Sequence, residues 1–267
     1  NCLILMRKAA WVDEEEFTAL SSAVKCHSNV RTSEFRSSVK EDDMVVGRYS
    51  VLPYYDEIER EVKNLGGHLI NSLTQHKFVA DVTRYAEILG DMTLSAYTSW
   101  MNLPEGKYVV KGKTNSKKFQ WNKMMFCENL EEVKSTANRL LDDTFIADQG
   151  LVVRPYVELD RLGEGINGLP VSNEWRFFFL GDHLIDCGFF WAGMLDDEPV
   201  VPPVEAMQFA GRVARKVAPF CNFFVVDVAK TASGEWVCIE LNDGQMSGLS
   251  CIPPERFYEN LICSLVV

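Results

Sequence analysis

Residues 236–250 read WVCIELNDGQMSGLS, an apolar strand followed by a glycine-rich turn. Because side chains alternate across a strand, the pattern predicts that Glu240 and Asn242 point the same way. Trp236 and Cys238 would share that face, and the opposite face would be apolar core, made of Val237, Ile239 and Leu241. The strand would therefore bring two hard oxygen ligands to one place.

A second strand offers a third oxygen ligand. In FFVVDVA (residues 223–229), alternation places Asp227 on one face with Phe223 and Val225. If this strand pairs with the first one across the 229–235 loop, Asp227 approaches Glu240 and Asn242. Two carboxylates and an amide oxygen suit Mg²⁺. The alternative is a set of solvated residues at a strand end, but an uncompensated charge in a buried sheet is costly.

Positive charge appears in two other segments. Residues 108–121, YVVKGKTNSKKFQW, put Lys111 and Lys113 on one face of a strand end, before a polar loop that carries Lys117 and Lys118. Such a loop can cover phosphates, although many lysine-bearing turns are simply solvated. In NEWRFFFL (residues 173–180), an arginine shares a face with a glutamate. Arg176 could clamp a phosphate or a carboxylate, or form a structural ion pair with Glu174.

Composition narrows the class of protein. The chain has 267 residues, 47% of them hydrophobic, and a formal net charge of -11, which argues against broad binding to nucleic-acid phosphates. No apolar stretch has the length of a membrane helix. The eight cysteines are scattered without a C-x-x-C motif, as in a reducing compartment, and the four histidines are isolated. We expect a cytoplasmic protein without a membrane segment.

The pattern of elements favours an α+β fold. Residues 1–75 alternate strand and helix, which predicts a small parallel α/β domain. A helix is expected over 77–91, and His76, directly before it, is expected on a polar helix face together with Lys77. From about residue 95 strands dominate, and Gly181-Asp182 occupies the place of a hairpin turn. The later part should therefore form antiparallel sheet.

Five segments together resemble the ATP-grasp superfamily, and within it the clade named for one arginine and two lysines. In chain order they are VVKGKTNSKKFQW, GLVVRPYVELD, NEWRFFFLGD, FFVVDVA and WVCIELNDGQMSGLS. The resemblance covers roughly residues 70–255. It implies an ATP-grasp domain over 76–267, whose subdomains (about 95–155 and 156–267) sandwich a nucleotide between antiparallel sheets. Residues 1–75 would be the α/β domain that precedes it.

The resemblance also implies roles for individual residues. Lys111 and Lys113 would contact ATP phosphates, under a mobile 114–118 loop that contains Ser116 and Lys118. The hinge beside adenine would consist of Arg154, Pro155, Tyr156 and Val157. Further nucleotide-binding candidates are Lys77 and Glu174. Arg176 would face the transferred phosphate, with Lys113 and Lys118 as its catalytic partners, and the Mg²⁺ ligands would be Asp227, Glu240 and Asn242.

These roles predict an ATP-dependent ligase that activates a carboxylate as an acyl phosphate for attack by an amine. Its cofactors would be ATP and Mg²⁺, its products ADP and phosphate, and its substrate a small molecule or a peptide. Two alternatives stay open. One is a kinase or nucleotidyl-transferring ligase that acts on nucleic acid, which the negative charge disfavours. The other is a non-catalytic ATP-binding module.

Overall fold

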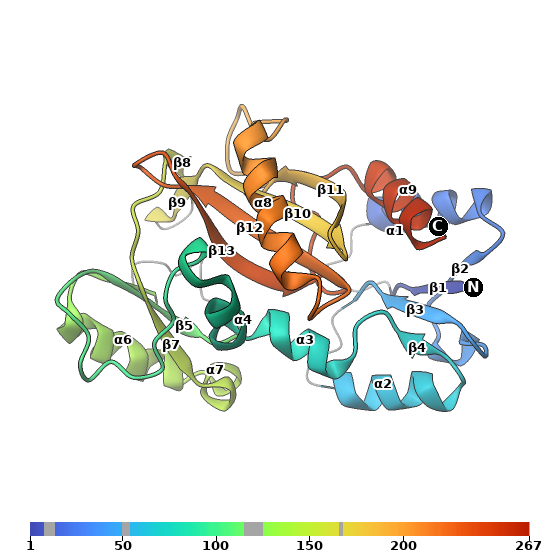
Figure 1. Cartoon of the computed structure of the whole chain (residues 1–267), viewed down its shortest axis with the longest axis horizontal. Coiled ribbons are helices and arrows are strands. Elements are labelled where there is room, and N and C mark those ends of the chain that lie inside the picture. Colours follow the sequence, from blue (N-terminus) through green and yellow to red (C-terminus); the bar gives the residue numbers. More distant parts are fainter. Residues whose placement is uncertain (8–13, 50–53, 115–124, 166–167, 267) are drawn as a thin grey trace.

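The antiparallel sheet at the centre of the molecule carries most of the predicted site. The computed structural model describes residues 1–7, 14–49, 54–114, 125–165 and 168–266. In it, four strands pair in the order β11-β10-β12-β13 (Figure 1). Their bounds are β10 Glu174–Leu180, β11 His183–Phe189, β12 Phe223–Lys230 and β13 Trp236–Asp243. The β10–β11 hairpin turns at Gly181, whose φ of +59° suits glycine, as predicted.

A smaller antiparallel sheet lies across from the first. Its order is β6-β5-β7, and helices α6 and α7 pack against β5. The bounds are β5 Tyr108–Gly112, β6 Phe126–Cys127, α6 Leu130–Leu141, α7 Thr144–Gln149 and β7 Leu151–Pro155. After β7 the chain forms a short hairpin of β8 Arg161–Glu164 and β9 Pro170–Ser172, and then enters β10.

The parallel sheet expected near the start of the chain is confirmed. Its strands pair in the order β2-β1-β3-β4, all parallel. The bounds are β1 Cys2–Leu5, α1 Glu14–Ala23, β2 Val30–Ser33, β3 Met44–Gly47, α2 Tyr55–Asn64 and β4 His68–Leu69. Short 3₁₀ turns also occur among the described residues, at Val24–Cys26, Arg36–Ser38 and Gly90–Met92.

The single helix predicted over 77–91 is instead two. Helix α3 (Leu73–Ala80) ends at Asp81, and helix α4 (Val82–Leu89) begins directly after it. The Asp81 carboxylate accepts a hydrogen bond from the backbone nitrogen of Thr83 at 2.9 Å, so it serves as the N-cap of α4. The prediction missed the break because the apolar spacing continues across it.

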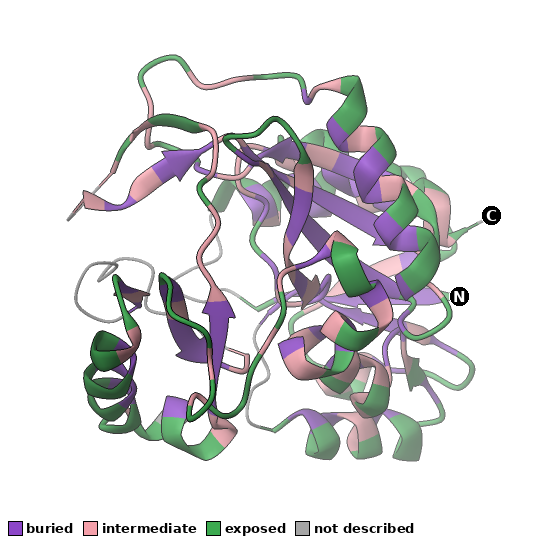
Figure 2. Cartoon of the chain, turned by 60° about the vertical axis from the view of Figure 1, so that its left-hand side comes forward, coloured by how far each residue is buried: buried purple, intermediate pink, exposed green. Residues whose placement is uncertain are grey.

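One hydrophobic cluster joins the first and last parts of the chain. Residues of the parallel sheet and α1 pack with Phe178, Phe223 and Val225 of the central sheet and with α9 (Pro254–Leu265). Figure 1 shows α9 beside α1, and Figure 2 shows the central strands buried over most of their length. Helix α8 (Val204–Val217) and α4 cover the other face of that sheet. No helix among the described residues has the length and apolar character needed to cross a membrane.

Candidate active site

The two predicted ligand strands pair as expected, but their register contains a bulge. Asp227 lies opposite Glu240, and Val228 lies opposite Cys238, so Ile239 is an extra residue on β13. The predicted common face of Cys238 and Glu240 is therefore wrong. Cys238 packs in the core beneath α8, whereas Glu240 shares a face with Asp227. Ile239, expected in the core, instead lines two cavities.

Three oxygen-bearing residues lie near one another on this face: Asp227 opposite Glu240, and Asn242 two residues further along β13. Asp227 is fully buried, and Glu240 and Asn242 are partly exposed. Among the described residues, no group of three or more His, Cys, Asp and Glu side chains is arranged to hold a metal ion. The candidate set nevertheless consists of two carboxylates and an amide oxygen, which is the donor chemistry that Mg²⁺ accepts.

Arg176 lies across from Asp227 on the neighbouring strand and is held in three ways. Its Nε and Nη2 atoms donate to the two Asp227 oxygens at 2.9 and 2.8 Å, and Nη1 donates to the Gly248 carbonyl at 2.8 Å. Its guanidinium carbon also lies 4.9 Å from the centre of the Phe190 ring. The sequence left open whether Arg176 forms a structural ion pair. In the structure it does, and its partner is Asp227 of the adjacent strand β12.

The charge of this pair changes the proton affinity of the arginine. Burial alone lowers the pKa of Arg176. The Asp227 carboxylate and its hydrogen bonds, together with the nearby Glu240 and Glu174 carboxylates, raise the pKa by more, so the net shift is upward. Arg176 therefore remains a fixed positive charge at any ordinary pH.

The lysine strand contributes a second ion pair. Lys111 of β5 is buried, and its Nζ lies 2.6 Å from Glu240 Oε1, which joins the two sheets. Lys113 follows the end of β5. The backbone there bonds to Gly150, and the Lys113 side chain lies against the same glycine. Ser116 and Lys118 lie outside the described residues.

Between the two sheets lies a cavity of about 120 Å³, which we call the inter-sheet cavity. It is lined mostly by apolar side chains, and the Lys111–Glu240 pair is also part of its lining. Its residues come from β5, β7, β13 and the segments beside them: Leu94, Val109, Lys111, Met125, Arg154, Pro155, Tyr156, Val157, Leu159, Ile239 and Glu240. The predicted hinge residues thus meet the lysine strand and one ligand strand here.

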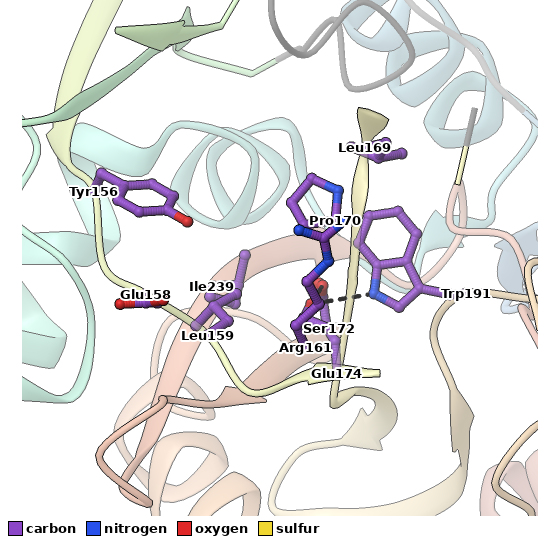
Figure 3. Close-up of a pocket in the computed structure, with 10 residues that line it drawn as sticks. All are labelled: Tyr156, Glu158, Leu159, Arg161, Leu169, Pro170, Ser172, Glu174, Trp191 and Ile239. Atoms are coloured by element: carbon purple, nitrogen blue, oxygen red, sulfur yellow. Dashed lines mark hydrogen bonds between the residues drawn. The ribbon is translucent and has the colours of Figure 1, made fainter. Parts of the chain in front are cut away.

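A second cavity, of about 160 Å³, lies beneath the β8–β9 hairpin, and we call it the hairpin cavity (Figure 3). It shares Tyr156, Leu159 and Ile239 with the first. Its other lining residues are Glu158, Arg161, Leu169, Pro170, Ser172, Glu174 and Trp191. The buried Glu174 carboxylate accepts a hydrogen bond from Ser172 Oγ at 3.2 Å, and Trp191 Nε1 donates to the same hydroxyl at 3.2 Å.

Two sequence assignments lie elsewhere. Lys77 is exposed on α3 and lines neither cavity. His76, predicted on a polar helix face, is instead buried: its ring stacks on Tyr55 at 4.5 Å, and Nδ1 lies 3.1 Å from Asp243 Oδ2. That prediction was wrong because the helix packs against the end of β13, where Asp243 gives the imidazole a partner.

Sequence reasoning missed several cavity residues. Ile239, Trp191 and Leu94 read as core or connecting residues, because nothing in an apolar run marks a bulge or a cavity wall. The number of residues between the two strands indicates a bulge only when the type of turn that joins them is known.

Solved structures with the same fold are ATP-grasp ligases. The chain resembles a D-cycloserine synthetase, DcsG (15% identity, TM-score 0.59, covering 99% of each chain), and the ATP-grasp ligase PsnB with a minimal precursor (12%, 0.59, 99% of this chain and 98% of that one). It also resembles a D-alanine–D-alanine ligase from Bacillus anthracis complexed with ATP (12%, 0.60, 99% and 94%). At these identities the likeness establishes the fold. No curated protein sequence matches.

The family can be read from the sequence itself. Residues 98–261 match the ATP-grasp domain of family 3 of the clade named for one arginine and two lysines. This stretch contains both antiparallel sheets, both cavities' principal strands and the paired charges described above. Because the match covers more than half of the chain, the protein belongs to this clade of the ATP-grasp superfamily, in its family 3.

Proposed function

We propose that the protein is an ATP-dependent ligase that activates a carboxylate as an acyl phosphate, which an amine then attacks. The observation that carries the proposal is the lining of the inter-sheet cavity. Its walls are mostly apolar, and the Lys111–Glu240 pair is also part of its lining. Glu240 lies opposite Asp227, the partner of Arg176. We call the apolar walls and these two ion pairs the apolar end and the charged end of the proposed site. A nucleoside triphosphate likewise combines a flat base with charged phosphates.

The apolar end suits the base. Leu94, Val109, Met125 and Ile239 would contact its faces, and the backbone of the segment through Val157 would bond its edge. In the hairpin cavity, Glu174 and Ser172 offer a carboxylate and a hydroxyl to the ribose. Tyr156 borders both cavities, and its ring meets Phe126 edge-on at 4.9 Å, which helps to fix this shared wall.

The charged end suits phosphates and a divalent cation. Asp227, Glu240 and Asn242 would hold Mg²⁺, which when bound would neutralise charge on the phosphates. The donor set fits that ion, because both carboxylates lie directly opposite one another on paired strands. Lys111 and Arg176 would turn from these carboxylates toward phosphate oxygens. Lys113, Ser116 and Lys118 remain proposed partners of the phosphates.

The proposed reaction depends mainly on positioning the reactants and on stabilising charge on the transferred phosphoryl group. A carboxylate oxygen attacks the γ-phosphorus, the bond to the β-phosphate oxygen breaks, and ADP leaves. The amine then attacks the acyl carbon, and phosphate departs with the former carboxylate oxygen. Arg176, which Gly248 and Phe190 also hold, would stabilise charge on the transferred group after a short turn from Asp227.

The class of substrate follows from chemistry shared by several neighbours. The structural relatives are described as bound to a precursor peptide, as a D-cycloserine synthetase and as a D-alanine–D-alanine ligase, which supports an amino-acid-like or peptide carboxylate here. The formal net charge of -11 disfavours a polynucleotide. A ligase or kinase acting on nucleic acid, and a non-catalytic ATP-binding module, are outcomes that the experiment distinguishes.

The test is acceptor-dependent turnover. The protein is incubated with ATP, Mg²⁺ and pools of amino acids, peptides or RNA ends, while nucleotide products are separated and hydroxylamine is added to trap an acyl phosphate. We expect ADP and a hydroxamate that both require a carboxylate. Glu240→Gln, which retains the shape of the side chain but loses its charge, is the matched inactive control. RNA-dependent AMP, or tight ATP binding without turnover in any pool, would contradict the proposal.

A further inference from the structure

The bulge in β13 is held from outside the central sheet. β13 is an edge strand, so one side of it has no strand neighbour in that sheet. On that side the two consecutive carbonyls at the bulge each accept a side-chain hydrogen bond. Thr93 Oγ1 donates to Cys238 O at 2.7 Å, and Arg154 Nη1 donates to Ile239 O at 2.7 Å. Bulges beside a site commonly redirect one side chain.

Arg154 ties together three segments that are distant in sequence. It belongs to β7, and besides the Ile239 carbonyl its Nη2 atom donates to Thr93 Oγ1 at 2.9 Å and to the Leu94 carbonyl at 2.8 Å. The residue is only 4% exposed. Its planar guanidinium presents several donors in fixed directions, which an ammonium group cannot reproduce. The guanidinium therefore fixes β7, the 93–94 segment and β13 relative to one another.

This clamp determines what the cavities contain. The two residues whose carbonyls it holds, Leu94 and Ile239, line the inter-sheet cavity, and Ile239 also lines the hairpin cavity. Without the bulge, strand alternation would turn Ile239 away from Glu240's face and into the sheet's core. The shape of the apolar wall thus depends on the hydrogen bonds that both Nη atoms of Arg154 donate to protein groups.

We propose that Arg154 is a positioning residue that sets base selectivity: together with Thr93 it holds Ile239 in the wall against which the base of the nucleotide packs. The inference rests on the proposed function, because it takes the inter-sheet cavity to be the base site. The wall is apolar, so its own contribution to selection operates by shape, beside the backbone groups that would bond the edge of the base. Arg154 acts on the nucleotide through Ile239 rather than by bonding to its phosphates.

The test compares binding of a set of nucleotides with binding of a probe that has no base. Dissociation constants are measured for ATP, GTP, CTP, UTP and the base-enlarged 1,N6-etheno-ATP, and for inorganic tripolyphosphate. The proteins are the wild type, Arg154→Met, Arg154→Lys and Ile239→Ala. Arg256→Met is the matched control. Arg256, like Arg154, donates several hydrogen bonds to protein groups, but its partners are the Asp186 carboxylate and the Cys187 carbonyl of the outer strand β11.

We expect the ratio between the weakest and the tightest nucleotide to fall at least tenfold in Arg154→Met and in Ile239→Ala, and less in Arg154→Lys. Tripolyphosphate affinity should stay within about threefold in all of them, because the charged end is intact. A purely structural role would weaken every ligand together. If Arg154→Met does not fold, the lysine and Ile239 variants carry the same comparison.

Two results overturn the inference in distinguishable ways. If the wild type discriminates among bases and the Arg154 and Ile239 variants retain its ratio, the positioning role is wrong while the proposed function stands. If the wild type binds no nucleotide, the proposed function falls and the inference falls with it. A loss of selectivity in Arg256→Met equal to that in Arg154→Met would also refute a specific role for Arg154.

Discussion

The two ends of the proposed nucleotide site are stabilised differently. At the charged end, Lys111 and Arg176 already have carboxylate partners, so a bound phosphate would exchange one partner for another. At the apolar end, Val109 and Ile239 would contribute only van der Waals contact with the ligand. Affinity at the first end should therefore depend on salt and on charge, and affinity at the second on shape and volume. Substitutions can separate the two contributions.

The largest effect is expected from Asp227→Asn. The substitution removes the anion from a buried bidentate pair and leaves the Arg176 guanidinium without its counter-charge. Breaking such a pair costs about 3–5 kcal/mol. Urea unfolding should show a loss of this size, and turnover should disappear. Arg256→Gln, which disrupts a half-exposed pair, is the control and should cost much less. Equal unfolding midpoints for the two variants would contradict the account of the charged end.

Lys111→Met should have the next largest effect, and on binding. One phosphate-facing cation is lost, so we expect the dissociation constant for ATP to rise at least tenfold, about 1.4 kcal/mol. The difference from wild type should shrink as salt increases. Lys134→Met, an identical change at an exposed position of α6, is the control. A titration curve equal to that of wild type at low salt would show that the lysine does not contact the nucleotide.

Val109→Ala should have the smallest effect and the opposite salt behaviour. It removes methyl groups from the apolar wall, which typically costs about 1 kcal/mol, or roughly fivefold in affinity. Because no charge changes, the ratio to wild type should be the same at low and high salt, and the same for ATP and adenosine. A salt-dependent ratio would mean that the two ends of the proposed site are not independent.

Strand alternation and one hairpin were enough to predict how Asp227 and Glu240 meet. Both residues lie in apolar runs separated by a short loop. The pairing of the two strands, and the face on which each side chain lies, therefore follow from the local pattern. Ile239 could not be placed in this way, since its bulge depends on Thr93 and Arg154, which are remote in sequence. The partner of Arg176 was also hidden, because it depends on which strand lies beside β10 rather than on β10 itself.

The packing of the parallel sheet against the central sheet could not be predicted from the sequence either. The rhythm of residues 1–75 predicts a separate α/β unit, and the parallel sheet is present. Its apolar face, however, shares a cluster with Phe223, Val225 and the last helix. A local pattern reports that a face is apolar but not what covers it. The burial of His76 against Asp243 has the same cause.

The most direct test of the proposed chemistry follows the carboxylate oxygen. Once the turnover experiment has found a carboxylate substrate, that acid is supplied with ¹⁸O in its carboxyl group, and the products are analysed by ³¹P NMR and mass spectrometry. The account predicts one ¹⁸O atom in inorganic phosphate, because phosphate leaves the acyl carbon with the former carboxylate oxygen, and none in the ADP. Label in AMP, with pyrophosphate as the other product, would show attack at the α-phosphorus and would contradict it.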